Sequence, residues 1–328
     1  MQVDLVIRGA RLTEVAGRAA AIESLGFDCV GVTETNGNPF LAAAQAVQGT
    51  SRVRVASAIA LAFPRSPMDV AYTAWDLQAL SGGRFALGLG SQVRAHVERR
   101  FGAAWSRPAA RMREYLLALG AIWDAWESGG ALDFRGEFYT HTLMPPNFRP
   151  PPLGHPRPPV LLAAVRERMT EVAGELADGF LGHAFSSGPV LRELTLPALE
   201  RGLERAGRAR DDLEVTAAVF VALTDVEWEA CRARVAFYGS TPGYRHVLDH
   251  HDLGALHEEL HRRSRAGEWD AMAALVEDDV LELFAVRGED PISLAASVTE
   301  RVGGVADRVA LVTELTDPAA LAPVAALL

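Results

Sequence analysis

Short, continuous runs of apolar residues recur along the whole chain, and longer segments with helical periodicity separate them. Eight of these runs have the length and composition of β-strands: 3–7, 29–33, 53–61, 84–89, 159–164, 179–183, 214–223 and 308–312. Most are apolar at consecutive positions rather than at every second one, which is typical of parallel strands buried on both faces. The pattern therefore predicts a parallel sheet covered by helices.

The segments between these runs carry apolar residues three and four positions apart. Pro39 and Pro67 stand where first helical turns would begin, and Gly26 follows an apolar helical pattern as a stop. Helices are expected at 12–25, 39–48, 67–80, 108–127, 167–177, 189–206, 226–237, 291–302 and 317–327. Eight strands alternating with helices indicate a closed (β/α)8 barrel or a long doubly wound sheet, and the lack of a composition shift favours the barrel.

We expect a single domain over residues 1–328, an α/β fold of the TIM-barrel type. Insertions are expected after strands 4 and 7, at about 91–158 and 238–290, because both connections are too long for simple barrel arms. Active sites of barrels lie at the carboxyl ends of the strands. Both insertions should therefore rise over that face and form the walls or lid of a pocket.

Composition narrows the class of protein. All 32 basic residues are arginine, and the net charge of −10 argues against nucleic acid or an anionic membrane as partner. Two isolated cysteines, Cys29 and Cys231, fit a reducing compartment. The N-terminal residues lack the pattern of a signal peptide, and no apolar stretch approaches the length of a membrane span. We expect a cytoplasmic protein.

Two short motifs suggest chemistry only weakly, and a third is absent. Gly88-Leu-Gly90 lacks the third glycine of a dinucleotide loop, since position 93 is valine. These glycines permit either close packing of strands or close approach of a flat ligand. His257-Glu-Glu-Leu-His261 matches the zinc-protease pattern, but its charged context favours a solvated helix. No G-x-S-x-G nucleophile elbow occurs.

Residues 91–113, directly after the fourth strand, contain six arginines and one glutamate. This cationic segment could receive the phosphates or carboxylates of a ligand tail, or its arginines could pair with acids elsewhere. His96 lies in the same segment, either over the barrel mouth or on the surface.

The order of these features resembles the bacterial luciferase-like monooxygenase family of flavin and deazaflavin oxidoreductases. The resemblance is carried by ESLGFDCVGVTET at 23–35, by RVRVASAIALAFPRSPMDVAYTAWDLQALSGGRFALGLGSQ at 52–92, and by FRGEFY, PPVLLAAVRERM and ELADGFLGH further on. The run from Pro67 through Leu80-Ser81 and Gly83-Arg84-Phe85 to Gly90 is the most specific part. The match extends over most of the chain.

The resemblance implies a flavin or deazaflavin ring at the C-terminal mouth of the barrel, against the ends of strands two to four. Relatives often have a non-proline cis peptide after the third strand, and Ala58-Ile59 is the matching pair. A cofactor phosphate would lie by the loop after the fifth strand. The residues that this implies as cofactor contacts are Thr33, Thr35, Ala58, Ile59, Ala60, Ser91, Gln92, Arg94, Ala164, Val165, Arg166 and His183.

Relatives that use deazaflavin F420 often have Asp-His after the second strand and Asn after the fourth. Here Glu34-Thr35 and His96 stand there, which leaves F420 and FMN both open. Glu34 and His96 are the candidates for proton transfer, with a structural ion pair as the alternative role of Glu34.

The leading hypothesis is an F420-dependent oxidoreductase that acts on a small organic substrate without a bound metal. An FMN-dependent monooxygenase of the same fold is the first alternative, and a non-catalytic flavin-binding relative is the second. Relatives commonly form homodimers, so a homodimer is possible.

Overall fold

Eight parallel strands close into a barrel in the computed structural model, which describes residues 1–313 and 317–328. Around the barrel each strand pairs with the next, and the last pairs with the first. The strands in this order are β1 (Gln2–Ile7), β2 (Cys29–Val32), β3 (Arg54–Ser57), β5 (Phe85–Gly90), β8 (Val160–Ala163), β9 (Gly179–Leu181), β10 (Glu214–Ala222) and β12 (Arg308–Val312). The predicted (β/α)8 barrel is confirmed, with all eight strands in the predicted places.

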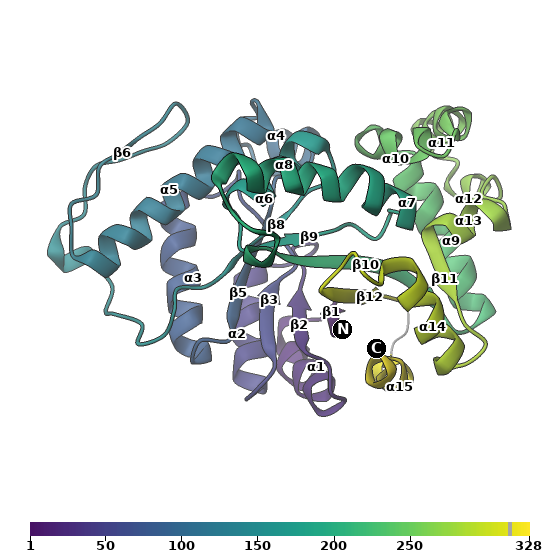
Figure 1. Cartoon of the computed structure of the whole chain (residues 1–328), viewed down its shortest axis with the longest axis horizontal. Coiled ribbons are helices and arrows are strands. Elements are labelled where there is room, and N and C mark those ends of the chain that lie inside the picture. The colour runs from purple at the N-terminus through teal and green to yellow at the C-terminus, as the bar shows by residue number, and fades with distance from the viewer. Residues whose placement is uncertain (314–316) are drawn as a thin grey trace.

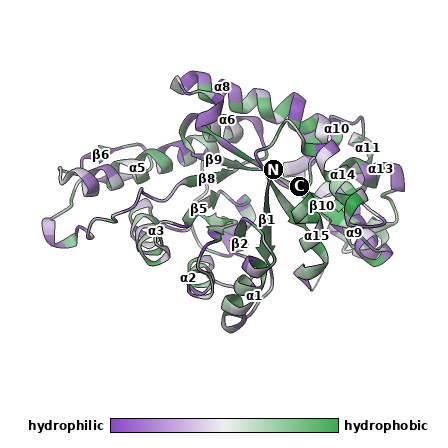
Figure 2. Ribbon diagram, turned by 60° about the horizontal axis from the view of Figure 1, so that its bottom comes forward, coloured by the Kyte–Doolittle hydropathy of each residue, from purple (hydrophilic) through white to green (hydrophobic). Residues whose placement is uncertain are grey.

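Helices surround the barrel, and the strands at its centre are its most apolar part (Figures 1 and 2). The helices of the barrel layer are α1 (Leu12–Ser24), α2 (Pro39–Gly49), α3 (Pro67–Ser81), α5 (Pro108–Ser128), α6 (Glu167–Leu176), α7 (Gly188–Val190), the π-helix η2 (Leu191–Thr195), α8 (Leu196–Ala206), α9 (Asp225–Gly239), α14 (Pro291–Val302) and α15 (Ala322–Leu327). The predicted starts at Pro39 and Pro67 are correct, because Asn38 and Ser66 cap these helices with their side chains.

The third predicted strand, 53–61, is not continuous. It is divided into β3 and a short strand β4 (Ala60–Leu61), with a cis peptide bond between Ala58 and Ile59. β4 pairs with β5 instead of extending the ladder between β2 and β3. The cis bond lies at the pair that the family resemblance implied.

Gly88 and Gly90 serve the packing of β5 against its neighbour. A Cβ atom on Gly88 would lie 1.8 Å from the carbonyl oxygen of Ser57, and one on Gly90 would lie 2.1 Å from Cδ1 of Ile59. The Ser57 hydroxyl also bonds to both the N–H and the carbonyl of Gly88. Protein atoms thus fill the space beside both glycines, which favours the packing interpretation over the ligand interpretation.

Only part of the first insertion lies at the mouth of the barrel; the rest runs along the outside of the helices. Helix α4 (Arg94–Arg99) stays at the mouth, where Arg100 after it donates to the carbonyl of Thr35. After α5 the chain forms a hairpin of β6 (Phe134–Arg135) and β7 (Thr140–His141), seen at the left of Figure 1, then the 3₁₀-helix η1 (Pro146–Phe148).

The proline-rich segment that follows descends along α3. Carbonyls of Phe148, Pro151 and Pro156 accept hydrogen bonds from Tyr72, Trp75 and Gln78, three side chains along one helix. Prolines lack the N–H groups that would hold this segment to itself, so its carbonyls bond to the helix. The expectation that the whole first insertion rises over the mouth is therefore wrong for residues 148–158.

The second insertion forms a helical lobe on a hydrophobic core of its own, at the right of Figure 1. It comprises the 3₁₀-helix η4 (Pro242–Tyr244), α10 (Arg245–Asp249), α11 (Gly254–Ala266), α12 (Trp269–Ala273), α13 (Asp278–Phe284) and β11 (Ala285–Arg287). The core of the lobe includes Phe185 after β9, Phe220 near the end of β10 and Val312 at the end of β12. The lobe therefore lies against the mouth, as predicted for this insertion.

At the opposite end, charged side chains lie inside the barrel. Arg308 forms hydrogen bonds with both carboxylate oxygens of Asp4, and Arg54 pairs with Glu214. Arg308 and Asp4 are both buried. Within the described residues, no helix is long and apolar enough to span a membrane.

Candidate active site

Partly exposed residues line the carboxyl ends of four neighbouring strands, β2, β3, β5 and β8. We call this set the rim; its members are Thr33, Ala58, Ile59, Ser91, Gln92 and Val165. All six are among the predicted cofactor contacts, so the fold brings them to one edge of the mouth. Ala60 and Ala164, also predicted contacts, are buried beneath this edge, and Thr35 is exposed beside it.

Glu34 is committed to a buried ion pair. Its two carboxylate oxygens accept from the guanidinium of Arg65 at 2.8 and 2.9 Å, and one of them also accepts from the N–H of Leu61. The Glu34 side chain is only 4% exposed. These bonds join the loop after β2 to the segment after β4, which corresponds to the structural role considered for this residue.

The other candidate for proton transfer, His96, is exposed on α4, and no described residue forms a hydrogen bond with its ring. On the same helix Arg94 pairs with Glu98 one turn later, at 3.0 Å. Arg107 and Arg113, further along the cationic segment, pair with Glu137 and Glu175. The excess positive charge near the mouth is thus smaller than the sequence suggests.

The loop after β8, predicted to contact a phosphate, is tied to the start of the lobe. Arg166 donates to the carbonyls of Pro242 and Gly243, at 2.9 and 3.3 Å. The ring of His246 bonds to the carbonyl of Val165 at 3.0 Å. These bonds use two donor nitrogens of Arg166 on main-chain oxygens, which reduces its capacity to bind an anion.

His183 lies after β9 and is held in one tautomer. Its Nδ1 accepts a hydrogen bond from the N–H of Phe185 at 3.0 Å, so in the neutral ring the proton is on Nε2. Burial, and then the charges of Arg8 and Arg234, lower the pKa of His183 to about 3. The ring is therefore neutral near pH 7, and Nε2–H is a donor that no described residue accepts from.

Three further residues at the mouth were not predicted from the sequence. Together with His183 they form what we call the mouth cluster: Arg8, His183, Tyr238 and Tyr244. Arg8 directly follows β1, so applying the strand-end rule to all eight strands would have found it. The tyrosines belong to α9 and η4, and no periodicity in the sequence indicates that they approach β9.

The histidines of the H-E-x-x-H sequence serve the packing of the lobe. Nδ1 of His257 bonds to the carbonyl of Gly239, and Nδ1 of His261 bonds to that of Ser240. The expectation of a solvated helix is wrong for this face, because His257 is 4% exposed. Both rings bond to carbonyls at the C-terminal end of α9, and among the described residues no group of three or more metal-ligating side chains gathers.

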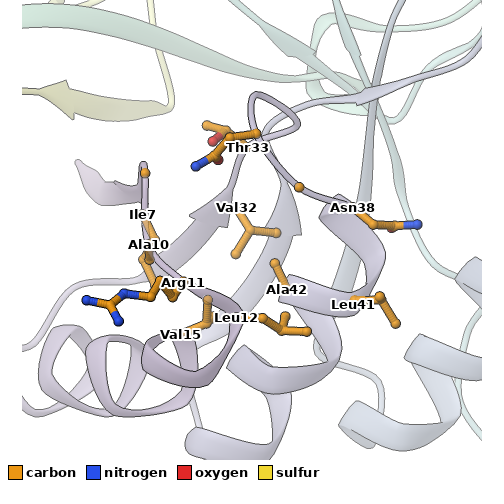
Figure 3. Close-up of a pocket in the computed structure, with 13 residues that line it drawn as sticks. Ile7, Ala10, Arg11, Leu12, Val15, Val32, Thr33, Asn38, Leu41 and Ala42 are labelled. Atoms are coloured by element: carbon orange, nitrogen blue, oxygen red, sulfur yellow. The ribbon is translucent and has the colours of Figure 1, made fainter. Parts of the chain in front are cut away.

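A cavity of about 410 Å³ lies beside the rim, between α1 and α2. Figure 3 shows its apolar lining, with Leu12 and Val15 on one side and Leu41 and Ala42 on the other. Thr33 belongs to both the cavity and the rim. The cavity opens under the loops that follow β1 and β2, outside the barrel axis.

The luciferase-like monooxygenase family matches residues 2–308 of the chain. An uncharacterized protein of Mycobacterium tuberculosis, Rv1360, is 49% identical over 306 residues, covering 91% of this chain and 89% of its own. The 5,10-methylenetetrahydromethanopterin reductase of Archaeoglobus fulgidus is 27% identical over 81% of this chain and 79% of its own. The structure of the coenzyme F420-dependent tetrahydromethanopterin reductase of Methanopyrus kandleri superposes with a TM-score of 0.80, at 20% identity, over 98% of this chain and 96% of its own.

Proposed function

The chain belongs to the luciferase-like monooxygenase family, and from that premise we propose that it is an F420-dependent oxidoreductase. In this proposal a hydride passes between the deazaflavin and a small organic substrate. The observation that carries the proposal is the rim, where the ends of the strands that the family resemblance assigns to the cofactor converge at one edge of the mouth.

The rim suits a flat heteroaromatic ring. Ala58 and Ile59 offer apolar surface, and the hydroxyls of Thr33 and Ser91 can bond to polar atoms at the edge of a ring. A deazaflavin combines the same two characters, an apolar body and a polar edge. We expect Gln92 and Val165 to complete this contact, with Thr35 and Arg94 toward the outside of the mouth.

When bound, the deazaflavin supplies the carbon that gives or takes the hydride; the protein supplies orientation, a dry pocket and proton control. Glu34 stays a candidate for proton transfer, and its ion pair with Arg65 would have to open for that role. His96 stays a second candidate on α4. Nε2–H of His183 can stabilise an oxygen atom that gains negative charge during the transfer.

Binding and turnover together test the proposal. Purified protein is titrated with F420 and, separately, with FMN, and bound cofactor is followed by fluorescence. Reduced F420 is then mixed with a panel of organic acceptors without oxygen. Saturable F420 binding and acceptor-dependent oxidation support the proposal; FMN binding alone, with oxygen consumption, contradicts it.

Two other functions fit the same fold. The family description favours an FMN-dependent monooxygenase, and the chain has Glu34-Thr35 where F420-dependent relatives often have Asp-His. A non-catalytic flavin-binding protein would bind a cofactor and turn over no acceptor. For all three functions we expect a cytoplasmic protein, with a homodimer possible.

A further inference from the structure

We propose that the cavity beside the rim binds the apolar part of the substrate, and that this part is an uncharged aliphatic chain. The inference rests on the proposed function, since it places the chain next to the cofactor. Thr33 lines the cavity and also belongs to the rim. A substrate whose reacting group lies at Thr33 can therefore extend its chain between α1 and α2, away from the barrel axis (Figure 3).

The cavity has a buried apolar floor. The buried members of its lining, Ile7, Val15 and Val32, come from β1, α1 and β2, and the large apolar side chains of the lining are all aliphatic. Its volume of about 410 Å³ lies within the range of roughly 300–1,000 Å³ that is typical of small-molecule pockets. Aliphatic walls of this kind favour a hydrocarbon chain over water.

Two leucines flank the cavity on the sides of the two helices. Leu12 in α1 is 44% exposed, and Leu41 in α2 is 56% exposed. A ligand chain between them would remove this apolar surface from water, which favours binding. Two leucines are a small surface compared with the about 800 Å² that each partner buries in a typical protein interface. A small molecule therefore matches the cavity better than a second copy of the chain.

Polar groups at the edge of the cavity already have partners. At the start of α1, the Arg11 guanidinium pairs with Glu14 at 3.2 Å, and its side chain is 86% exposed. At the start of α2, Oδ1 of Asn38 accepts from the N–H of Phe40, and Pro39 has no N–H to offer. The carboxylate of Glu14 also places a negative charge in the first turn of α1. These contacts favour an uncharged ligand over an anion.

The loop after β2 lies between the cavity and the rim. Within it, the Thr35 hydroxyl donates to Oδ1 of Asn36 at 3.2 Å, and the hydroxyl oxygens of Thr33 and Thr35 lie 3.4 Å apart. The carbonyl of Thr35 accepts from Arg100 at 2.8 Å, which anchors the loop to the segment after α4. A hydroxyl has one donor and two acceptor positions, so the Thr33 hydroxyl can form one more hydrogen bond, with a polar head group at the rim.

The probe for this site is 1-octanol, titrated into the purified protein in a calorimeter, with octanoate at pH 8 as its charged analogue. Wild-type protein should bind 1-octanol saturably, and octanoate at least about 10-fold more weakly, because a carboxylate would lose its hydration. In the series 1-butanol, 1-hexanol and 1-octanol, each added CH₂ group should strengthen binding about 4-fold, the factor that corresponds to burying one methylene.

Two matched variants locate the binding. Leu41→Arg should weaken 1-octanol binding about 10-fold, because it replaces an apolar wall of the cavity with a charged side chain. Leu80→Arg is the control: Leu80 is a 49% exposed leucine in α3, outside the cavity lining, and its replacement should leave binding unchanged. Both variants should bind F420 like the wild type, since neither residue belongs to the rim.

Equal 1-octanol binding by Leu41→Arg, or none by the wild type, overturns the inference, and so does octanoate binding tighter than that of 1-octanol. A wild-type dimer in sedimentation equilibrium that Leu41→Arg dissociates would assign the surface to a second copy instead. In turnover with reduced F420 and an acceptor, 1-octanol should raise KM and leave kcat unchanged; an unchanged KM would contradict the assignment to the substrate. If F420 fails to bind the wild type while 1-octanol binding depends on Leu41, the cavity site stands and the proposed cofactor falls.

Discussion

The two ends of the barrel differ in whether their charged side chains form ion pairs. At the amino ends of the strands, Asp4 pairs with Arg308 and Arg54 pairs with Glu214, so each charged side chain has an opposite partner. At the carboxyl ends, Arg8 is an exposed arginine that pairs with no described residue, and the ring of His183 is kept neutral, chiefly by burial. The ion pairs fill the barrel at the amino ends of the strands and contribute to the stability of the fold. Uncompensated polar groups at the other end are what a ligand-binding site provides.

The largest expected effect comes from breaking the paired end. Arg308→Met leaves the carboxylate of Asp4 buried without its partner, which should lower the free energy of unfolding by about 3–5 kcal/mol. Arg8→Met at the mouth should change it by less than about 0.5 kcal/mol, because Arg8 has no described partner to lose. Urea denaturation of both variants measures the difference, and equal losses would remove the contrast between the two ends.

At the mouth, Glu34 forms a buried ion pair with Arg65, as the charged residues at the opposite end do with their partners. Glu34→Gln should cost about 1–3 kcal/mol of unfolding free energy, because Arg65 loses a buried ionic partner. Glu98→Gln, which removes an exposed pair with Arg94, should cost less than about 0.5 kcal/mol. If Glu34→Gln unfolds like the wild type but abolishes one limb of the pH–rate profile, Glu34 acts in proton transfer instead.

His183 should make the mouth sensitive to acid. Its folded pKa of about 3 lies below the ordinary value of 6.5, so between these values the unfolded chain binds a proton that the folded chain does not. This contribution lowers stability as the pH falls from 6.5. His183→Asn should therefore lose less stability than the wild type between pH 6.5 and 5, by about 1.5 kcal/mol. The midpoints of urea unfolding of the wild type and of His183→Asn, measured at pH 6.5 and pH 5, check this. Equal shifts of the midpoint in the two proteins would contradict it.

The smallest expected effect concerns F420 binding by three exposed arginines, two in α4 and one directly after it. Replacing Arg94, Arg99 and Arg100 with glutamine should weaken F420 binding about 3- to 10-fold at low salt. The difference should vanish near 1 M salt, where charges are screened over about 3 Å. Fluorescence titrations at two salt concentrations measure it. Unchanged affinity at low salt would show that these arginines do not contact the acidic tail of the cofactor.

The fold could be predicted from the sequence because buried parallel strands leave continuous apolar runs, and Pro39 and Pro67 mark helix starts. The break after Ser57 could not be predicted from periodicity alone, since 54 and 57 are the only polar positions in 53–61 and residues 58–61 are all apolar; only the family resemblance indicated Ala58-Ile59.

The position of candidate site residues at strand ends could be predicted, as for Thr33 and Ser91; their role stays a prediction. The approach of Tyr244 to His183 could not, because it depends on how the lobe packs and joins segments some 60 residues apart, which no local pattern encodes. The ion pair of Glu34 could not be predicted either, because β3 and β4 separate Glu34 from its partner Arg65 in the chain.

We expect the deazaflavin to bind at the mouth of the barrel and not at its closed end. An F420 titration of the wild type, Ser91→Trp and Gln48→Trp tests it most directly, because Ser91 lies on the rim and Gln48 is an exposed residue near the end of α2, away from the mouth. We predict saturable binding by the wild type and by Gln48→Trp, and none by Ser91→Trp. Equal binding by all three proteins, or none by the wild type, would contradict the claim.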